Sequence, residues 1–198
     1  MAENTGTGPS YPYASLSGIA RILIIVMIIG VPLGVLSRFF DPLEIPSYLA
    51  IGTQVILFLI WFYRAHRNLP ALAATELAFT HAWAIIWWFI PILNFWKPYQ
   101  VTVEIVKSSD PSVGRTDASI RSALPLPHLV IIRWMYVFIG GAIAIGIAFG
   151  GGPLEFRATV SGINDVITTF LGIFLILEIT KRQTKKIALI HSGGYGSF

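Results

Sequence analysis

The sequence has no cysteine and few charged residues, and both absences restrict what the protein can be. Without cysteine, disulfide bonds, thiolate catalysis and Cys-ligated metal clusters are excluded. Asp, Glu, Lys and Arg make up only 12% of the 198 residues, about half of the charged fraction of a soluble domain. The chain also lacks a Gly-rich phosphate loop, a zinc-ligand spacing and a Ser/His/Asp arrangement. We therefore expect a protein that is not an enzyme.

Apolar residues, by contrast, are abundant. Hydrophobic residues account for 55% of the chain, and the mean hydropathy is +0.70. A transmembrane helix needs about 20 predominantly apolar residues. The long uncharged runs of this chain predict an all-α, polytopic membrane bundle with about four transmembrane helices. We expect these spans at about residues 16–36, 47–63, 129–149 and 162–179, within a single bundle domain of residues 16–187.

The segments outside the spans are polar or rich in Gly, Pro and Ser. Residues 1–15 are expected to form a flexible arm, and residues 188–198 a C-terminal tail. The N-terminus has neither a basic region nor a small-residue cleavage site, so we expect no cleaved signal peptide. Residues 68–81 are mildly amphipathic and predict a short surface helix. Residues 101–128 predict a cytoplasmic loop that begins as a helix.

Residues 82–100, AWAIIWWFIPILNFWKPYQ, combine four tryptophans with two prolines. Trp and Tyr favour the membrane–water interface, while Pro91 removes a helix hydrogen bond in the middle of the segment. The strongly apolar part before Pro91 is too short for a straight span. We therefore predict a broken, re-entrant or interfacial helical hairpin, with a kinked fifth span as the alternative.

The distribution of Lys and Arg predicts the orientation of the chain. The net charge is +4, and the basic residues flank the apolar runs, which is typical of loops that face anionic lipid and does not suggest nucleic acid. With four spans and a hairpin that does not cross, twelve basic residues lie on one side and only Arg38 and Arg157 on the other. With a fifth span, the best division is ten against four. The positive-inside rule favours four spans, with both termini in the cytoplasm.

Aromatic and basic residues of the second span and the hairpin form the first candidate site. They are expected at the same membrane level, where they could hold a phospholipid head group or brace the hairpin against the second span through cation–π contacts. The residues of this structural or lipid-facing group are Trp61, Tyr63, Arg64, Arg67, Asn68, Trp83, Trp87, Trp88, Pro91, Asn94, Trp96, Lys97, Pro98, Tyr99 and Gln100.

The last two predicted spans supply further candidates. Small residues at near-helical spacing predict close approach of another helix, at Gly140, Gly141, Ala144 and Gly146. Glu178 is the carboxylate inside the last apolar run, and an acid within a membrane suggests an ion or proton site. Lys181 and Arg182 follow one turn later, so a local ion pair explains Glu178 equally well. Asp165 could cap the outer end of the last helix.

Three histidines, His66, His81 and His128, are weak candidates for a metal, haem or chlorophyll ligand. None lies in the middle of a predicted span, no two are four residues apart, and no carboxylate motif accompanies them. We therefore expect ordinary interfacial histidines and no cofactor other than bound lipid. Glu104 and Lys107 are expected to form a solvated pair on a surface helix.

Two blocks of sequence resemble a known family. WFYRAHRNLPALAA (Trp61–Ala74) and AWAIIWWFIPILNFWKPYQVTVEIVKSS (Ala82–Ser109) are similar to the bacterial membrane proteins grouped as domain of unknown function 4328. The matching positions are Trp61, Arg64, Asn68, Trp83, Trp87, Trp88, Pro91, Asn94, Trp96, Pro98, Tyr99, Gln100 and Glu104.

The chain departs from the family pattern at the entry to the hairpin. Ala73 stands where members often have glycine, and Thr80-His81-Ala82 replaces a Pro-Gly, which puts the family's form of this turn in doubt. The resemblance implies a multi-span bundle in a bacterial inner membrane and supplies no activity.

Three functions are consistent with these features. The first is an accessory or scaffold subunit of a larger membrane assembly, of respiratory or photosynthetic type, with lipids and other membrane subunits as partners. The second is a transporter or binder of a small solute or lipid, with the broken hairpin lining a cavity. A carrier of haem or chlorophyll is the third. No inverted repeat and no run of interior ionisable residues supports transport, so we favour the first.

Overall fold

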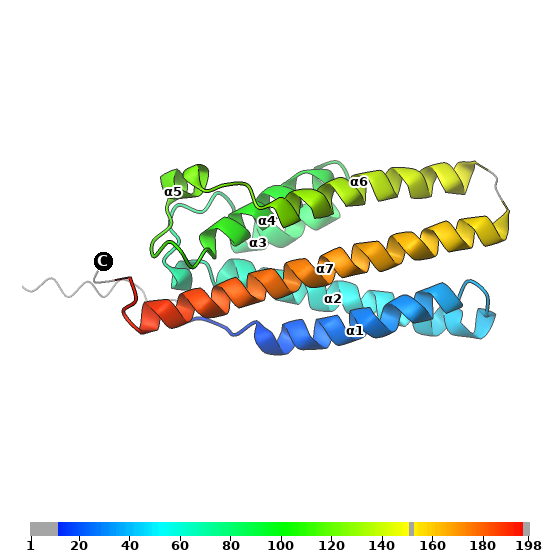
Figure 1. Cartoon of the computed structure of the whole chain (residues 1–198), viewed down its shortest axis with the longest axis horizontal. Helices are drawn as coiled ribbons and strands as arrows, with labels where there is room; N and C mark the ends of the chain where they lie inside the picture. Colours follow the sequence, from blue (N-terminus) through cyan, green and yellow to red (C-terminus); the bar gives the residue numbers. More distant parts are fainter. Residues whose placement is uncertain (1–11, 151–152, 196–198) are drawn as a thin grey trace, which may run out of the picture.

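The computed structural model describes residues 12–150 and 153–195, without the side chains at positions 138, 143–145, 147–149 and 154. The described residues form helices and, apart from one isolated bridge between Ala74 and Thr116, no β structure. Four long helices lie side by side along the molecule (Figure 1). They are α1 (Ser17–Leu36), α2 (Glu44–Arg67), α6 (His128–Phe149) and α7 (Leu154–His191).

The apolar composition of these helices fits a membrane protein. Among the described residues, three helical stretches are long and apolar enough to cross a membrane: Ser17–Leu36, Asp41–Arg67 and Glu155–His191. The all-α class and the presence of helices long and apolar enough to span a membrane are thus confirmed. In the bundle α1 packs on α2 and α7, and α6 packs on α7.

The last helix is much longer than the predicted span of residues 162–179. It runs for 38 residues, which at about 1.5 Å per residue exceeds the roughly 30 Å of a bilayer core. The basic run after Ile179 does not end it, because Lys, Arg and Gln are good helix formers in water. The predicted capping role of Asp165 is wrong, because α7 already begins at Leu154, directly after Pro153.

Residues 68–81 do not form the predicted surface helix. After a short 3-10 turn, η2 (Pro70–Leu72), the chain runs in an irregular path, and Leu69, Leu72 and Ala74 are buried. Ala73 has φ 57°, a left-handed conformation that favours glycine. The buried side chains and the irregular backbone are incompatible with one amphipathic surface helix.

The Trp-rich segment is broken, as the sequence predicts, into α3 (His81–Ile86), η3 (Trp87–Phe89), η4 (Leu93–Phe95) and α4 (Lys97–Ser108). The side chain of Thr80 caps α3 by accepting a hydrogen bond from the backbone N–H of Trp83, 3.4 Å away. The chain then reverses around Pro91, so that α3 and α4 lie beside one half of the long bundle, together with the short helix α5 (Ala118–Ala123) (Figure 1).

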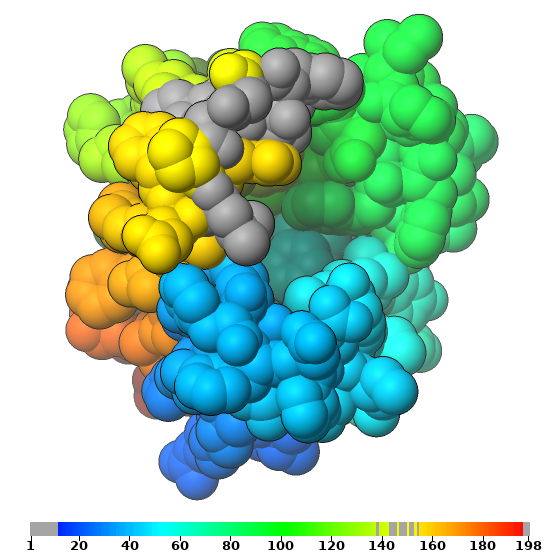
Figure 2. Space-filling model, turned by 90° about the vertical axis from the view of Figure 1, so that its right-hand side faces the viewer, coloured from blue at the N-terminus to red at the C-terminus, as the bar shows by residue number. Residues whose placement is uncertain are grey.

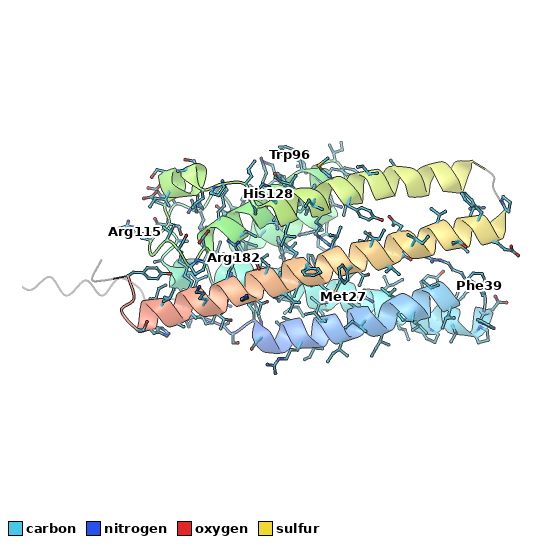
Figure 3. The ribbon with its side chains drawn as sticks, in the orientation of Figure 1. Met27, Phe39, Trp96, Arg115, His128 and Arg182 are labelled. Atoms are coloured by element: carbon cyan, nitrogen blue, oxygen red, sulfur yellow. The ribbon has the colours of Figure 1, made fainter. Side chains whose placement is uncertain are left out.

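The tightly packed core lies in the half of the bundle that contains the hairpin. Trp61, Phe62, Leu72, Ile105 and Ile176 are among the buried side chains there. In the other half, the outer faces of α1 and α2 carry exposed isoleucine and leucine side chains. Figure 3 shows this division: Arg115 and Arg182 mark the hairpin end, and Phe39 marks the opposite end.

Candidate functional site

The hairpin is fixed to α2 mainly by ring contacts. The indole of Trp88 meets Phe58 and Phe62 edge-on, with ring centroids 5.2 Å and 5.7 Å apart. Trp83 stacks on Trp87 at 4.6 Å. Each such pair contributes about 0.5–1.5 kcal/mol beyond the burial of area. The aromatic residues of the sequence motif therefore join the hairpin to the second long helix.

The predicted aromatic–basic group is divided between two places. Lys97 lies over the rings of Phe79 and Trp87, 5.6 Å from each centroid, and its ammonium donates to Gln100. Arg64 and Arg67 instead line a cavity of about 300 Å³ with Pro12, Tyr13 and Ala14. The sequence predicts a cation–π contact between the hairpin and the second span. Lys97 instead makes such contacts with Trp87 in the hairpin and with Phe79 just before it.

The remaining predicted residues of this group differ widely in exposure. Trp61 is fully buried, and its indole N–H donates to Thr180 at 3.3 Å. Pro98 is also buried, whereas Tyr63 and Pro91 are exposed. Asn94 donates its backbone N–H to Ile90 at 2.7 Å and so closes the turn around Pro91. Trp96 is exposed and contacts Tyr99, with ring centroids 5.6 Å apart.

A buried amide pair joins four segments of the chain. The side chain of Asn68 accepts from the Ala14 N–H at 2.9 Å and donates to the Ala14 carbonyl at 2.8 Å. It also donates to Gln183 at 3.0 Å, and Gln183 donates in turn to the Ala65 carbonyl and to Ser109. The N-terminal segment, α2, the end of α4 and α7 are thereby joined by satisfied hydrogen bonds.

The structure brings two of the three candidate histidines together with a carboxylate. The Nδ1 atoms of His66 and His81 are 2.8 Å apart, and Nε2 of His66 lies 3.2 Å from Glu104. Glu104 also accepts the Ala78 N–H at 2.6 Å. No carboxylate motif accompanies the histidines in the sequence, and the fold supplies a carboxylate from α4 instead.

This arrangement also overturns the expected solvated pair of Glu104 and Lys107. Glu104 is buried, and Lys107 donates to the Arg121 carbonyl at 2.9 Å. Both ring nitrogens of His66 are engaged, so neither is free for a haem. In the part of the chain that the structure describes, no group of three His, Cys, Asp or Glu could hold a metal ion.

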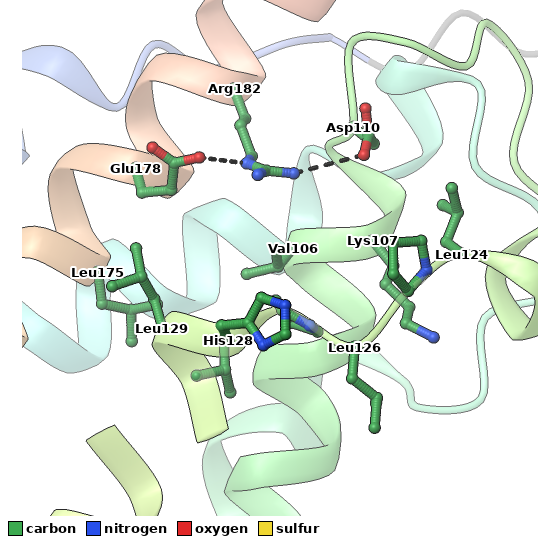
Figure 4. A pocket seen from close by; sticks show the side chains of 13 residues that line it. Val106, Lys107, Asp110, Leu124, Leu126, His128, Leu129, Leu175, Glu178 and Arg182 are labelled. Atoms are coloured by element: carbon green, nitrogen blue, oxygen red, sulfur yellow. Dashed lines mark hydrogen bonds and ion pairs between the residues drawn. The ribbon is translucent and has the colours of Figure 1, made fainter. Parts of the chain in front are cut away.

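A second polar cluster lies around Arg182 (Figure 4). Its guanidinium donates to Glu178 at 2.6 Å and to Asp110 at 3.4 Å. The local ion pair that the sequence suggests for Glu178 is therefore formed. Burial opposes the ionisation of Asp110, but hydrogen bonds from Ser112 and the charge of Arg182 hold its pKa below the usual value.

The Arg182 cluster borders a cavity of about 280 Å³. His128, the third candidate histidine, lines it together with Lys107 and leucine side chains, far in sequence from the His66–His81 contact. Two cations and two carboxylates face this space, and the carboxylates already share Arg182. The cavity therefore offers little unpaired charge to a ligand.

The predicted helix-packing glycines behave differently from one another. Gly140 is buried, and a side chain there would overlap Asn164 of α7. Gly141 and Gly146 are exposed, and no described atom lies within 4 Å of where their side chains would begin. The side chain of Ala144 lies outside the described part of the structure. The absence of a side chain at Gly140 therefore leaves space for the side chain of Asn164, and not for the backbone of a neighbouring helix.

The sequence analysis missed the polar side chains that enter the bundle at glycines. Gln54 of α2 fills the space beside Gly30, and Arg133 of α6 crosses α7 at Gly172. Arg38 forms an ion pair with Asp165 near the opposite end. A signal existed for two of these residues, because Gln54 and Arg133 are polar residues within or beside long apolar runs.

Comparison with known proteins gives one match. A family model described as "Domain of unknown function (DUF4328)" matches residues 43–179, a range that includes both sequence blocks noted above and the hairpin. No curated protein and no solved structure matches the chain.

Proposed function

The chain belongs to the family of domain of unknown function 4328, and from this premise we propose that it is a non-catalytic, multi-pass membrane protein that acts by packing. Its role would be that of an accessory or scaffold subunit in a larger membrane assembly, of respiratory or photosynthetic type. The observation that carries this proposal is the contrast between the two halves of the bundle. One half contains the buried core and a network of hydrogen bonds between distant segments, and the other presents exposed apolar faces of α1 and α2.

The proposed topology has four spans and a re-entrant hairpin. α6, with 22 residues, reaches about 33 Å and serves as the fourth span. Both ends of the described chain lie at the hairpin end of the bundle (Figure 1), as an even number of spans requires. Arg115 and Arg182 belong to the same end, which favours a cytoplasmic location for it in the cytoplasmic membrane.

The rigid half supports a role in packing. Its donors and acceptors are used to join segments of the chain, as in the Asn68–Gln183 pair. Its rings interlock through Trp88, Phe58 and Phe62. A body of this kind has little conformational freedom to lose when it associates, which lowers the cost of binding a partner.

The half of the bundle away from the hairpin supplies the surface that would contact a partner. Ile28 on α1 and Leu49 on α2 are 57% and 67% exposed, and apolar faces of this size are covered by lipid or by another membrane protein. In a membrane, association depends on close packing of such faces rather than on their removal from water.

Site-specific crosslinking tests the accessory role. Because the chain has no cysteine, Ile28→Cys, Leu49→Cys and the control Arg115→Cys each carry a single thiol for a photoreactive maleimide in native membranes. We expect the first two to crosslink to one protein that also co-purifies with the tagged chain at fixed stoichiometry. Crosslinks to lipid alone, with a chain that purifies without a companion, would refute the accessory role.

A second candidate function, the binding of a lipid or small solute, is favoured by one observation: the cation of Arg133 lies beside an apolar cavity in the bundle.

A further inference from the structure

Arg133 places a positive charge in the interior of the bundle. A methyl group added to Gly172 would lie 3.0 Å from the Nη1 atom of Arg133. The same methyl group would lie 3.0 Å from the Cε atom of Met27. Met27 is near the middle of the 20-residue helix α1, and Gly172 is halfway along α7. The sequence analysis counted Arg133 on the cytoplasmic side, but its guanidinium extends to the level of mid-span residues, where ionisable groups are rare and functional.

The charge of Arg133 has no counter-ion within the described residues. Its guanidinium donates to the backbone carbonyl of Thr168, 3.2 Å from Nη1. The ion pairs of the described chain involve Arg38, His66 and Arg182 instead. A guanidinium stays protonated in proteins, so burial cannot remove its charge. Arg133 is half-buried, and a cation held partly out of water is stabilised when an anion neutralises it.

The guanidinium lines a cavity of about 310 Å³ whose other walls are mostly apolar. Side chains of α1, α2 and η3 form these walls, among them Met27, Phe58 and Phe89. Arg133 is the charged residue of the lining, and Gln54 adds a side-chain amide. A ligand that fits this environment has an apolar body and one negatively charged group.

A further donor is available at the same cavity. Trp88 lines it, and the buried indole N–H of Trp88 has no acceptor among the described residues. Buried donors are nearly always paired in folded proteins. Arg133 and Trp88 thus bring two donor groups to one space whose lining contains no carboxylate. Gln54 also lines this space, and one hydrogen of its amide is donated to the Val26 carbonyl, 3.4 Å away. This set is complementary to an oxyanion and repels no part of it.

The molecule also has a depression that is open at one end. Figure 2 shows a hollow between the turn of α1 and α2, in blue and cyan, and the hairpin, in green. A second cavity of about 190 Å³ lies on the other side of Gln54, lined by Gly30, Asp165 and Thr168. Asp165, which lines this second cavity, forms an ion pair with Arg38.

We propose that Arg133, with Gln54 and Trp88, binds the carboxylate of a single-chain amphiphile, a long-chain fatty acid, whose tail occupies the apolar cavity. The carboxylate receives charge-assisted hydrogen bonds from the guanidinium, and these are stronger than bonds between neutral groups. A neutral ester of the same chain keeps the apolar contacts and loses the ionic ones. This site is independent of the accessory role, since it needs no protein partner.

Quenching of tryptophan fluorescence by bromine tests the site in the full chain in neutral detergent. The probes are a dibrominated long-chain fatty acid, its methyl ester and a dibrominated phosphatidylglycerol. We expect the acid to quench saturably, with half-saturation at least about tenfold below that of the ester. Arg133→Gln should abolish this preference, while Arg157→Gln, which removes an arginine near the start of α7, should keep it.

Two results would overturn the proposal: equal half-saturation for acid and ester in the unmodified chain, or an unchanged preference in Arg133→Gln. A phosphatidylglycerol that equals the acid and depends on Arg133 would assign the site to phospholipid and refute the fatty-acid assignment. Should Arg133→Gln not fold, Gln54→Leu takes its place, with an expected weakening of acid binding by about threefold and no change for the ester. No weakening in that variant would contradict the site.

Discussion

At the scale of single residues, the polar groups with the largest structural roles have partners far away in the sequence. His66 is 15 positions from His81 and 38 from Glu104. No local spacing could have predicted these contacts, because they depend on how α4 folds back against α2. Asn68 was predicted as a member of the aromatic and basic group and by the family resemblance, but not as a buried amide. Gln183 stands in a run of basic residues typical of solvent-exposed sequence, and nothing there indicates a buried amide.

The contact between His66 and His81 predicts a stability that depends on pH. Burial, followed by the positive charges of His66 and Arg67, lowers the pKa of His81 from its usual value of 6.5, and Glu104 acts in the opposite direction. The unfolded chain therefore binds this proton more readily than the folded chain does. The contribution of His81 to stability is complete above about pH 6.5 and is lost as the pH falls below that value.

We expect the thermal midpoint of the purified protein to fall between about pH 7.5 and about pH 5.5, and His81→Gln to make this fall smaller. His191→Gln, at the exposed end of α7, should leave the fall unchanged. Thermal unfolding followed by circular dichroism in detergent measures both. An equal fall in His81→Gln and the unmodified chain would assign the pH dependence to other groups.

At the scale of helices, hydropathy predicted where the four long helices lie, and Pro91 predicted the break in the Trp-rich segment. The ends of the helices were predicted less well. α7 continues at both ends because helix formation in water does not require apolar residues. Residues 68–81 do not form the predicted helix, because the burial of Leu69, Leu72 and Ala74 in the tertiary structure outweighs a weak local amphipathicity.

The two neighbouring glycines of α6 provide a matched test of how that helix meets α7. A methyl group at Gly140 would overlap the side-chain oxygen of Asn164, whereas one at Gly141 would meet nothing within 4 Å. Gly140→Ala should therefore lower stability by about 1–3 kcal/mol. Gly141→Ala should leave stability unchanged or raise it by up to about 1 kcal/mol, because alanine favours helix.

Thermal denaturation of the two glycine variants in one detergent distinguishes these outcomes. A thermal midpoint that falls for Gly140→Ala and not for Gly141→Ala supports the observed α6–α7 contact. Equal midpoints for the two variants would mean that Asn164 does not occupy the space beside Gly140.

At the scale of the whole molecule, the bundle is packed unevenly. The hairpin fills the space beside the long helices in one half, where the core is dense and Asn68 is hydrogen-bonded to Gln183. In the other half the helices have no such filling, and cavities reach Gln54 and Arg133. Composition alone predicted a membrane bundle, but the unequal halves could not be predicted, because they depend on how far the hairpin extends along the bundle.

The central claim is that the hairpin returns to the side from which it enters, and side-specific thiol labelling in intact cells tests it most directly. Single cysteines replace Ala78, before the hairpin, Ser112, after it, and Asp41, in the turn between α1 and α2; all three positions are exposed. The account predicts that a membrane-impermeant maleimide labels Ala78→Cys and Ser112→Cys from one side only and Asp41→Cys from the other. Labelling of Ala78→Cys and Ser112→Cys from opposite sides would show that the hairpin is a fifth span.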